Sequence, residues 1–287
     1  MTHIDRQVRD LVKKALARSG FVITRAEAPL DQPMSVYKRH YQFLSVEYDF
    51  WIFDETGRQW YDHDFWENAP EFQLLESMVK SSSKVLEIGL HHGFTGVFLA
   101  KHLDANAGGR YCGMELLPKA ALITQAQFKL NDLGDNCSVV NAAGSSSVGE
   151  VRVRDAIDGN GSVNPKDEGI VVECLPGDCM LERLDKITLL KIDVEGYELE
   201  VLRGCQEILK SRPMVALEVH LDLLKSFGAS VDEIWSMIPM DRYEARYLHN
   251  PRSSYIRPDT HTVTKLNNLR EFPTTGIVNL FLFPKAA

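Results

Sequence analysis

LLKIDVEGYELEVLRG, residues 189–204, is the stretch of sequence that decides the fold. An apolar run at 187–190 predicts a buried strand, and the strand pattern ends in two carboxylates, Asp193 and Glu195. Gly196 then breaks the strand, and a helical pattern follows. A carboxylate at the end of a buried strand is costly unless it has a partner. The pair therefore predicts a functional site at this strand end.

Strand and helix patterns alternate on both sides of this stretch. Apolar runs predict seven strands, at 84–90, 110–115, 136–141, 187–193, 213–219, 242–248 and 276–283. Helical patterns predict helices at 69–80, 93–104, 118–130, 197–210 and 229–239, and a polar, glycine-rich excursion at 144–170. This alternation predicts an α/β fold with a doubly wound, mostly parallel sheet. The last two strands lack an intervening helix, which predicts an antiparallel hairpin at one edge.

Residues 1–68 come before this alternation and are predicted to form an N-terminal helix and cap, while 69–287 form the main domain. Apolar residues recur at helical spacing from Ile4 to Leu16, Gly20 follows as a helix stop, and FVITR (21–25) is a short strand candidate. We expect the helix to dock on its own domain or on a second subunit, which would make a homodimer. Association with a membrane surface is the less favoured alternative.

Aromatic residues are concentrated in the cap. Residues 41–66 contain ten of the 26 aromatic residues in the chain. DETG (54–57) is a turn signal between two aromatic strands and predicts a hairpin. We expect the aromatic side chains to form the core of the cap. They could also provide a lid or a stacking surface for a substrate such as a sugar ring.

Composition narrows the function classes. The chain has 287 residues and a net charge of −8, which makes a nucleic-acid backbone a poor partner. Five irregularly spaced cysteines favour a reducing compartment, so we expect a cytoplasmic protein. The charged N-terminus is not a secretory signal, and no segment approaches the roughly 20 apolar residues that span a bilayer.

A glycine-containing turn, EIGLHHG (87–93), lies where the first strand of the main domain gives way to a helix. Glycines at such a turn allow a ligand to approach the backbone, next to the free N–H groups of a helix N-terminus. Glu115 ends the following strand and could accept hydrogen bonds from the hydroxyls of a ribose. The alternative for Glu115 is a surface charge. Glu87 and Glu115 together predict a nucleoside ligand.

The chain resembles the FkbM family of class I S-adenosylmethionine-dependent methyltransferases over roughly residues 70–285. The resemblance rests on LLKIDVEGYELEVLRG, the glycine turn, VVNAAGS (139–145) and ALEVH (216–220). It implies a Rossmann-like fold and S-adenosylmethionine as cofactor, contacted by Glu87, Gly89, His91, Gly93, Glu115, Asn141, Ala142 and Asp193. Two features depart from the family pattern: the bulky His91–His92 pair within the turn, and CLPGDCML (174–181) before strand four.

The resemblance also implies that the fourth predicted strand, at 187–193, ends beside the transferred methyl group. Asp193, Glu195 and His220 are then the predicted catalytic residues, one of which accepts the proton of a hydroxyl. Glu195 could instead cap the helix that begins at Tyr197, and His63 in the cap is a reserve candidate for the base. His91 and His92 could join Asp193 and His220 around a metal, but the spacing does not specify a site, so we expect no metal.

These observations predict a methyltransferase, and the acceptor that they favour is a hydroxyl oxygen of a small molecule, natural product or glycan. Transfer to nitrogen or to a carboxylate is one alternative. A catalytically silent binding protein that keeps the fold is another, and the His91–His92 pair is the feature that favours it. The expected partner is a small-molecule or glycan acceptor, with no nucleic acid and no stable membrane insertion.

Overall fold

The structure is a computed structural model that describes residues 36–154, 162–163, 169–250 and 262–286. These residues belong to one compact unit, which begins at Val36. The predicted helix that begins at Ile4, the strand candidate FVITR and the self-association assigned to them lie outside the described residues. Among the helices that are described, none combines the length and the apolar character needed to cross a membrane.

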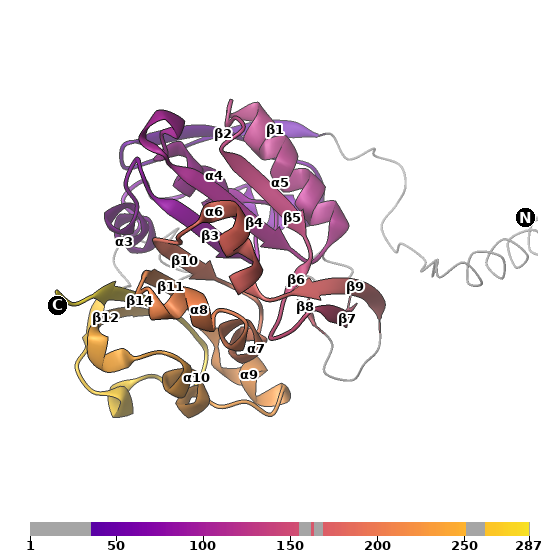
Figure 1. The fold of residues 1–287 in the computed structure, drawn as a ribbon. Helices are drawn as coiled ribbons and strands as arrows, with labels where there is room; N and C mark the ends of the chain where they lie inside the picture. Colours follow the sequence, from indigo (N-terminus) through magenta and orange to yellow (C-terminus); the bar gives the residue numbers. More distant parts are fainter. Residues whose placement is uncertain (1–35, 155–161, 164–168, 251–261, 287) are drawn as a thin grey trace, which may run out of the picture. The chain divides into compact units, whose positions relative to one another are not determined.

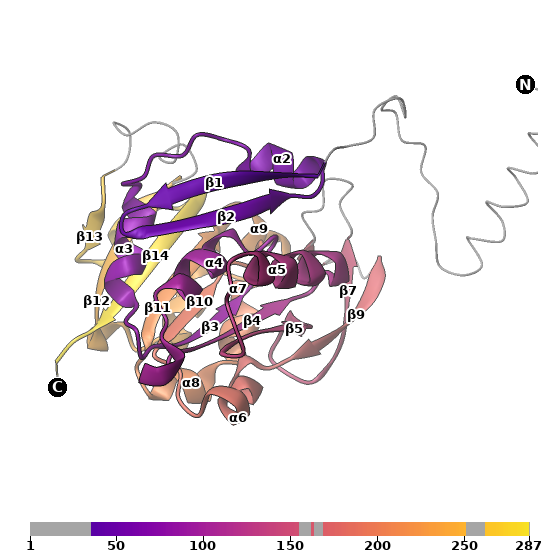
Figure 2. The same ribbon diagram turned by 90° about the horizontal axis from the view of Figure 1, so that it is seen from above.

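The centre of the fold is an eight-stranded sheet with the order β13-β12-β14-β11-β10-β3-β4-β5 (Figures 1 and 2). Strands β11, β10, β3, β4 and β5 run parallel, and β14 lies antiparallel between β11 and β12. The strands are β3 (Lys84–Ile88), β4 (Arg110–Glu115), β5 (Cys137–Asn141), β10 (Leu189–Ile192), β11 (Met214–His220), β12 (Tyr243–His249), β13 (Thr264–Leu266) and β14 (Ile277–Pro284). The predicted doubly wound sheet with an antiparallel edge is confirmed, and the three-residue β13 adds an eighth strand.

Strand alternation divides the core between the two faces of the sheet. On β10, Leu190 and Ile192 belong to one apolar cluster, whereas Leu189 belongs to the other. Helices cover both faces, as Figure 2 shows. They are α3 (Pro70–Met78), α4 (Phe94–Lys101), α5 (Pro118–Leu130), α6 (Leu181–Leu184), α7 (Glu198–Arg203), α8 (Gln206–Lys210), α9 (Leu221–Ser226) and α10 (Val231–Met237), with 3-10 turns at Ala105–Ala107, Gly177–Met180, Met240–Arg242 and Leu269–Glu271.

The single helix predicted over 197–210 is wrong. The structure has two short helices, α7 and α8, with Gly204 between them. A Cβ atom on Gly204 would lie 1.9 Å from the backbone oxygen of Ser145. The chain therefore passes another backbone too closely for any side chain, and the helix ends there.

The cap begins with an antiparallel hairpin of β1 (Tyr37–Phe43) and β2 (Val46–Ile52). The prediction that residues 54–57 form the hairpin turn is wrong. Asp54 is instead the N-cap of α2 (Glu55–Tyr61), and its carboxylate accepts a hydrogen bond of 2.8 Å from the Gly57 N–H. The true turn contains Leu44, whose φ of 54° is left-handed.

The hairpin is fastened to helix α5 by two side-chain amides. The Gln127 amide exchanges two 2.8 Å hydrogen bonds with the backbone of Trp51, and Asn131 pairs in the same way with Asp49 at 3.0 and 2.7 Å. These bonds satisfy part of the free edge of β2. The inner aromatic rings pack against α4, where Phe94 lies 5.1 Å from Phe50, so the expected aromatic core is present.

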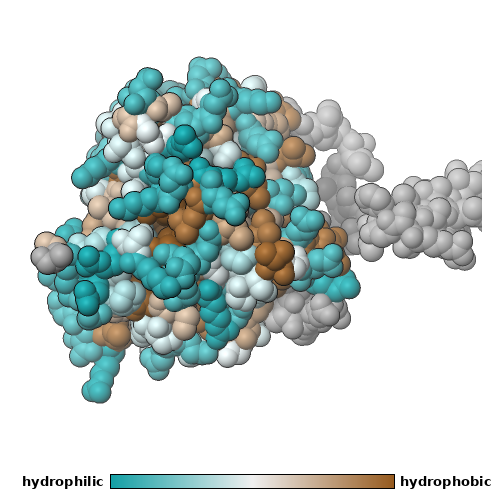
Figure 3. Space-filling model, in the orientation of Figure 1, coloured by the Kyte–Doolittle hydropathy of each residue, from teal (hydrophilic) through white to brown (hydrophobic). Residues whose placement is uncertain are grey.

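The polar, glycine-rich segment at 144–170, for which no strand was predicted, contains strands of a second sheet. Its order is β6-β9-β7-β8, formed by β6 (Ala143–Gly144), β9 (Ile170–Leu175), β7 (Gly149–Arg154) and β8 (Ser162–Val163). Several apolar side chains here are exposed, among them Val148 in the loop between β6 and β7 and Val171 on β9. On the face drawn in Figure 3 most of the described surface is hydrophilic, with smaller hydrophobic groups between.

Candidate functional site

A cavity of about 320 Å³ opens at the carboxyl ends of β3, β4, β10 and β11. This edge is where ligands bind in open α/β sheets. The strand register brings Ile88, Met114 and Ile192 level with one another, so the residues after them converge. The cavity is lined by main-domain residues 88–91, 94–95, 114–117, 142–144, 191, 193–195 and 218, and by residues 59–61, 63, 65 and 71–72 from the cap and helix α3.

The two glycines of the first turn are required by the backbone itself. Gly89 has a φ of 89°, and a Cβ atom there would lie 1.7 Å from the backbone oxygen of Asp193. Gly93 has a φ of 83°, and its Cβ would meet the Thr124 side chain at 2.6 Å. Both glycines were predicted to contact the cofactor, but Gly89 lines the cavity and Gly93 does not. The turn therefore presses against the end of β10 and leaves its backbone facing the ligand space.

Glu115 holds this turn in place. Its Oε2 accepts hydrogen bonds from the N–H groups of Leu90 at 3.0 Å and His91 at 2.8 Å, and its Oε1 accepts one from Leu117 at 2.9 Å. A carboxylate offers about four acceptor positions, so about one remains for a ligand. The side chain lines the cavity but is only 5% exposed, and this burial raises the pKa of Glu115 to about 7.

Glu87 does not line the cavity and is fully buried. It accepts hydrogen bonds from the Tyr111 hydroxyl at 2.5 Å and the Thr95 hydroxyl at 2.6 Å, and it pairs with Lys191 Nζ at 3.1 Å. Burial alone would lower the pKa of Lys191, but the carboxylates of Glu87 and Asp193 outweigh it and raise that pKa. Glu87 thus anchors a buried lysine that reaches the cavity.

The His91–His92 pair joins the cap to the turn. The rings stack with centroids 4.4 Å apart, and the Tyr61 hydroxyl lies 2.5 Å from His91 Nδ1. His91 lines the cavity, whereas His92 is buried beside Asp54, with His92 Nε2 3.8 Å from Asp54 Oδ1. Burial lowers the pKa of His92 to about 4. Lys119 of α5 also pairs with Asp54. These contacts are a physical reason for two bulky residues in the turn.

Two further predicted residues lie at the end of β5. The Asn141 side-chain amide donates to the backbone oxygens of Glu115 at 2.8 Å and Leu116 at 3.1 Å, so it fastens the end of β4. Ala142 lines the cavity, and Asn141 does not. Their expected contacts with a cofactor stay predictions.

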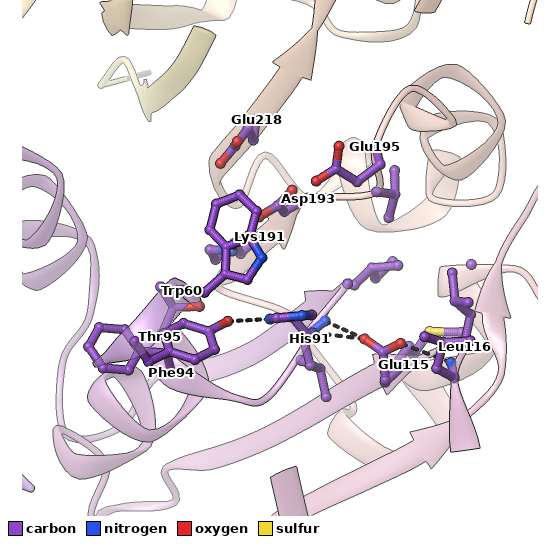
Figure 4. Close-up of a pocket in the computed structure, with 18 of the residues that line it drawn as sticks. Trp60, His91, Phe94, Thr95, Glu115, Leu116, Lys191, Asp193, Glu195 and Glu218 are labelled. Carbon is purple, nitrogen blue, oxygen red and sulfur yellow. Dashed lines mark hydrogen bonds and ion pairs between the residues drawn. The ribbon is translucent and has the colours of Figure 1, made fainter. Parts of the chain in front are cut away.

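Three carboxylates, of Asp193, Glu195 and Glu218, gather on one side of the cavity (Figure 4). Glu115 lies apart from them, beside Leu116, and Trp60 of the cap is drawn next to Lys191 and Asp193. Strand β10 covers Leu189–Ile192 and so ends one residue before the predicted end at 193. Glu195 has a left-handed φ of 52°, which places it within a turn after the strand.

His220 lies behind these carboxylates and is 2% exposed. Its Nδ1 is 2.9 Å from Glu198 Oε1, and its Nε2 is 3.2 Å from Glu195 Oε2 and 3.4 Å from Glu218 Oε1. Burial lowers its pKa, but the carboxylates, Glu198 first, raise the pKa of His220 to about 10. His220 is not among the residues that line the cavity.

The structure brings the three predicted catalytic residues, Asp193, Glu195 and His220, close together. Two residues that contact this group, Lys191 and Glu198, were missed by the sequence analysis. Lys191 and Glu198 lie within the opening motif itself, where they read as ordinary strand and helix residues. Helix α7 begins after Tyr197 without a side-chain cap. The Gly196 N–H in the preceding turn donates to Glu198 at 3.0 Å.

Comparison with known proteins identifies the fold family. The family model described as methyltransferase FkbM domain matches residues 87–248. The hexuronic acid methyltransferase AglP of Haloferax volcanii is 36% identical over 80 residues, which are 26% of this chain and 34% of that protein. The match thus spans about a third of the length of this curated relative.

Solved structures of methyltransferases are similar at low sequence identity. The FkbM methyltransferase from Methylobacillus flagellatus KT is 17% identical with a TM-score of 0.45, over 71% of this chain and 44% of that one. The O-methyltransferase from Bacillus cereus, solved with SAH, is 15% identical with a TM-score of 0.43, over 78% and 85% of the two chains. The family model matches more than half of the residues of this chain. The chain therefore belongs to the FkbM methyltransferase family, whose methyl donor is S-adenosylmethionine.

Proposed function

We propose that the protein transfers the methyl group of S-adenosylmethionine to a hydroxyl oxygen of a small molecule or glycan. The observation that carries this proposal is that the glycine turn, Glu115 and the carboxylates of Asp193 and Glu195 line one cavity. When bound, the cofactor supplies an electrophilic methyl group whose departure leaves a neutral thioether.

The residues that line the cavity fit this cofactor. Asp193 and Glu195 would face the positive charges of its sulfonium and ammonium groups, which favours binding electrostatically. The remaining acceptor position of Glu115 suits a ribose hydroxyl. Met114 and Ala142 provide apolar lining beside it, suited to a flat base.

A hydroxyl acceptor must lose its proton as the O–C bond forms. Asp193 and Glu195 are the proposed proton acceptors, because both line the cavity. His220 is a weaker choice than the sequence suggested: both of its ring nitrogens face carboxylates, and it does not line the cavity. Its proposed role is to orient the turn that carries Glu195. His63, the reserve candidate, lines the cavity from the cap.

The aromatic side of the cavity supports a carbohydrate-like acceptor. Trp60, Tyr61 and Phe65 line it from the cap, and aromatic faces pack well against the apolar faces of sugar rings. The printed name of the Haloferax volcanii relative, a hexuronic acid methyltransferase, favours the same class of acceptor.

The test is transfer of a labelled methyl group to a panel of hydroxyl, amine and carboxylate acceptors. Asp193→Asn or Glu195→Gln should lower turnover by about 10²–10⁴-fold on hydroxyl acceptors. Glu207→Gln, which changes an exposed glutamate of α8, is the matched control and should keep full turnover. Transfer to amines alone, or full activity in both cavity variants, would contradict the proposal.

A further inference from the structure

We propose that Asp193, Glu195 and His220 form a binding site for a divalent metal ion, with Mn²⁺ as the best-suited probe. One ligand atom from each of the three side chains lies within 4.8 Å of the other two. The inference deepens the proposed function and rests on it for the role of the ion, since the site adjoins the cavity in which the acceptor would react. The binding of the ion can be tested without the reaction.

The orientation of His220 is the observation that points to a ligand. Its side chain is 2% exposed, and Nδ1 lies 2.9 Å from the fully buried carboxylate of Glu198. The same oxygen of Glu198 accepts the Gly196 N–H at 3.0 Å, so the carboxylate is itself fixed. Metal-binding histidines commonly donate their second ring N–H to a carboxylate, which sets the tautomer and the ring direction.

The second ring nitrogen is buried and aimed into the acidic cluster. His220 Nε2 makes no hydrogen bond to the described residues, although oxygens of Glu195 and Glu218 lie 3.2 and 3.4 Å away. The ring therefore points between these carboxylates rather than at one of them. A metal ion at that position would take the place of the Nε2 proton, accept the lone pair of that nitrogen and be contacted by several carboxylates at once.

The charge of the cluster favours a doubly charged ion. Asp193, Glu195 and Glu218 converge on the Nε2 side of the ring, with Glu198 behind it. Lys191 Nζ lies 4.0 Å from the Asp193 carboxylate but is shared with Glu87 at 3.1 Å. Carboxylates clustered at low exposure are costly unless their charge is balanced. One imidazole combined with carboxylates is a donor set suited to Mn²⁺, Fe²⁺ or Zn²⁺.

An ion at this place would assist the proposed transfer. It would stabilise the negative charge that develops on the acceptor oxygen as the hydroxyl proton passes to a carboxylate. The new O–C bond forms while the S–C bond breaks, and the thioether leaves without charge. The expectation of no metal came from sequence spacing, which does not show that the ends of β10 and β11 bring these three residues together.

Mn²⁺ binding to the chelator-treated full chain tests the site directly, without cofactor. Titration calorimetry and electron paramagnetic resonance should show one bound ion per chain, with nitrogen modulation from the His220 imidazole. His220→Gln should abolish the nitrogen signal. Asp193→Asn and Glu195→Gln should each weaken binding by at least 10-fold, and Glu198→Gln by about 10–100-fold through loss of ring orientation.

Glu207→Gln, on the exposed surface of α8, is the matched control and should bind Mn²⁺ as the wild type does. Circular dichroism confirms that each variant is folded, and Glu195→Gln provides the test if His220→Gln does not fold. Absence of Mn²⁺ binding, or binding unchanged in the Asp193 and Glu195 variants, would overturn the site. Chelated protein that binds no Mn²⁺ but still transfers methyl groups would overturn the metal and leave the proposed function standing.

Discussion

Replacing Lys191 by methionine should destabilise the fold strongly, because it leaves a buried charge without its partner. Glu87 is 0% exposed and Lys191 is 6% exposed, and their charged atoms lie 3.1 Å apart. Methionine keeps the length and the apolar stem of lysine but removes the ammonium. Breaking a buried pair by deleting one partner costs about 3–5 kcal/mol.

Equilibrium unfolding in urea measures this cost. A loss of about 4 kcal/mol, with a slope of about 3 kcal/mol per molar urea, shifts the midpoint by about 1.3 M. Adding Glu87→Gln to Lys191→Met removes the unpaired charge and keeps an acceptor for the hydroxyls of Tyr111 and Thr95. The double variant should therefore be more stable than Lys191→Met alone, by about 0.5–3 kcal/mol.

Lys210→Met is the matched control, because its pair with Glu207 is exposed, at 70% and 60% for the two side chains. That change should cost about 1 kcal/mol or less. If Lys191→Met is as stable as Lys210→Met, the buried pair does not stabilise the fold and the reasoning fails. If Glu87→Gln instead abolishes cofactor binding in a fully stable protein, Glu87 is a ligand contact.

Three further predictions concern the first turn. Gly108→Ala should cost about 1–2 kcal/mol of unfolding free energy for its left-handed φ alone, because the space around Gly108 is open. Gly89→Ala should cost several times more, because a Cβ atom there would lie 1.7 Å from a backbone oxygen. Equal urea midpoints for the two variants would contradict this. The pKa of His92 is lowered to about 4 by burial, so the unfolded chain binds more protons below pH 6.5, and stability should fall by about 3 kcal/mol between pH 6.5 and pH 4. His92→Gln should flatten the stability profile in that range, and an unchanged slope would refute the assignment. Burial raises the pKa of Glu115 to about 7, and a ribose hydroxyl donates a stronger hydrogen bond to the ionised carboxylate than to the protonated carboxyl group. Cofactor affinity measured by calorimetry should therefore weaken as pH falls from 8 to 6, and Glu115→Gln should remove that dependence.

The sheet could be predicted from the sequence because each parallel strand is a short apolar run that is followed by polar or glycine residues. Glu115 and Asp193 both follow such runs, and the carboxyl ends of neighbouring parallel strands meet at one edge. The mostly parallel sheet with an antiparallel edge is confirmed, and so is the resemblance to the FkbM family. The contacts of these residues with a cofactor remain predictions.

Other features depend on contacts that no local pattern contains. Asp54 suits a hairpin turn and a helix N-cap equally well, and only the position of α2 decides between them. The partner of Lys191 is Glu87 on the adjacent strand, which requires the register of β3 and β10. Glu198 reads as a polar residue at a helix start, yet it lies buried against His220, 22 residues away.

Titration calorimetry of the full chain with S-adenosylmethionine tests the central claim most directly. The account predicts one bound cofactor per chain and loss of that binding in Ala142→Trp, because Ala142 is 2% exposed and lines the cavity, so a bulky ring there would fill it. Thermal unfolding of Ala142→Trp shows whether the variant is folded. A wild-type protein that gives no binding heat at any temperature, or a folded Ala142→Trp variant that binds as tightly as the wild type, would contradict the account.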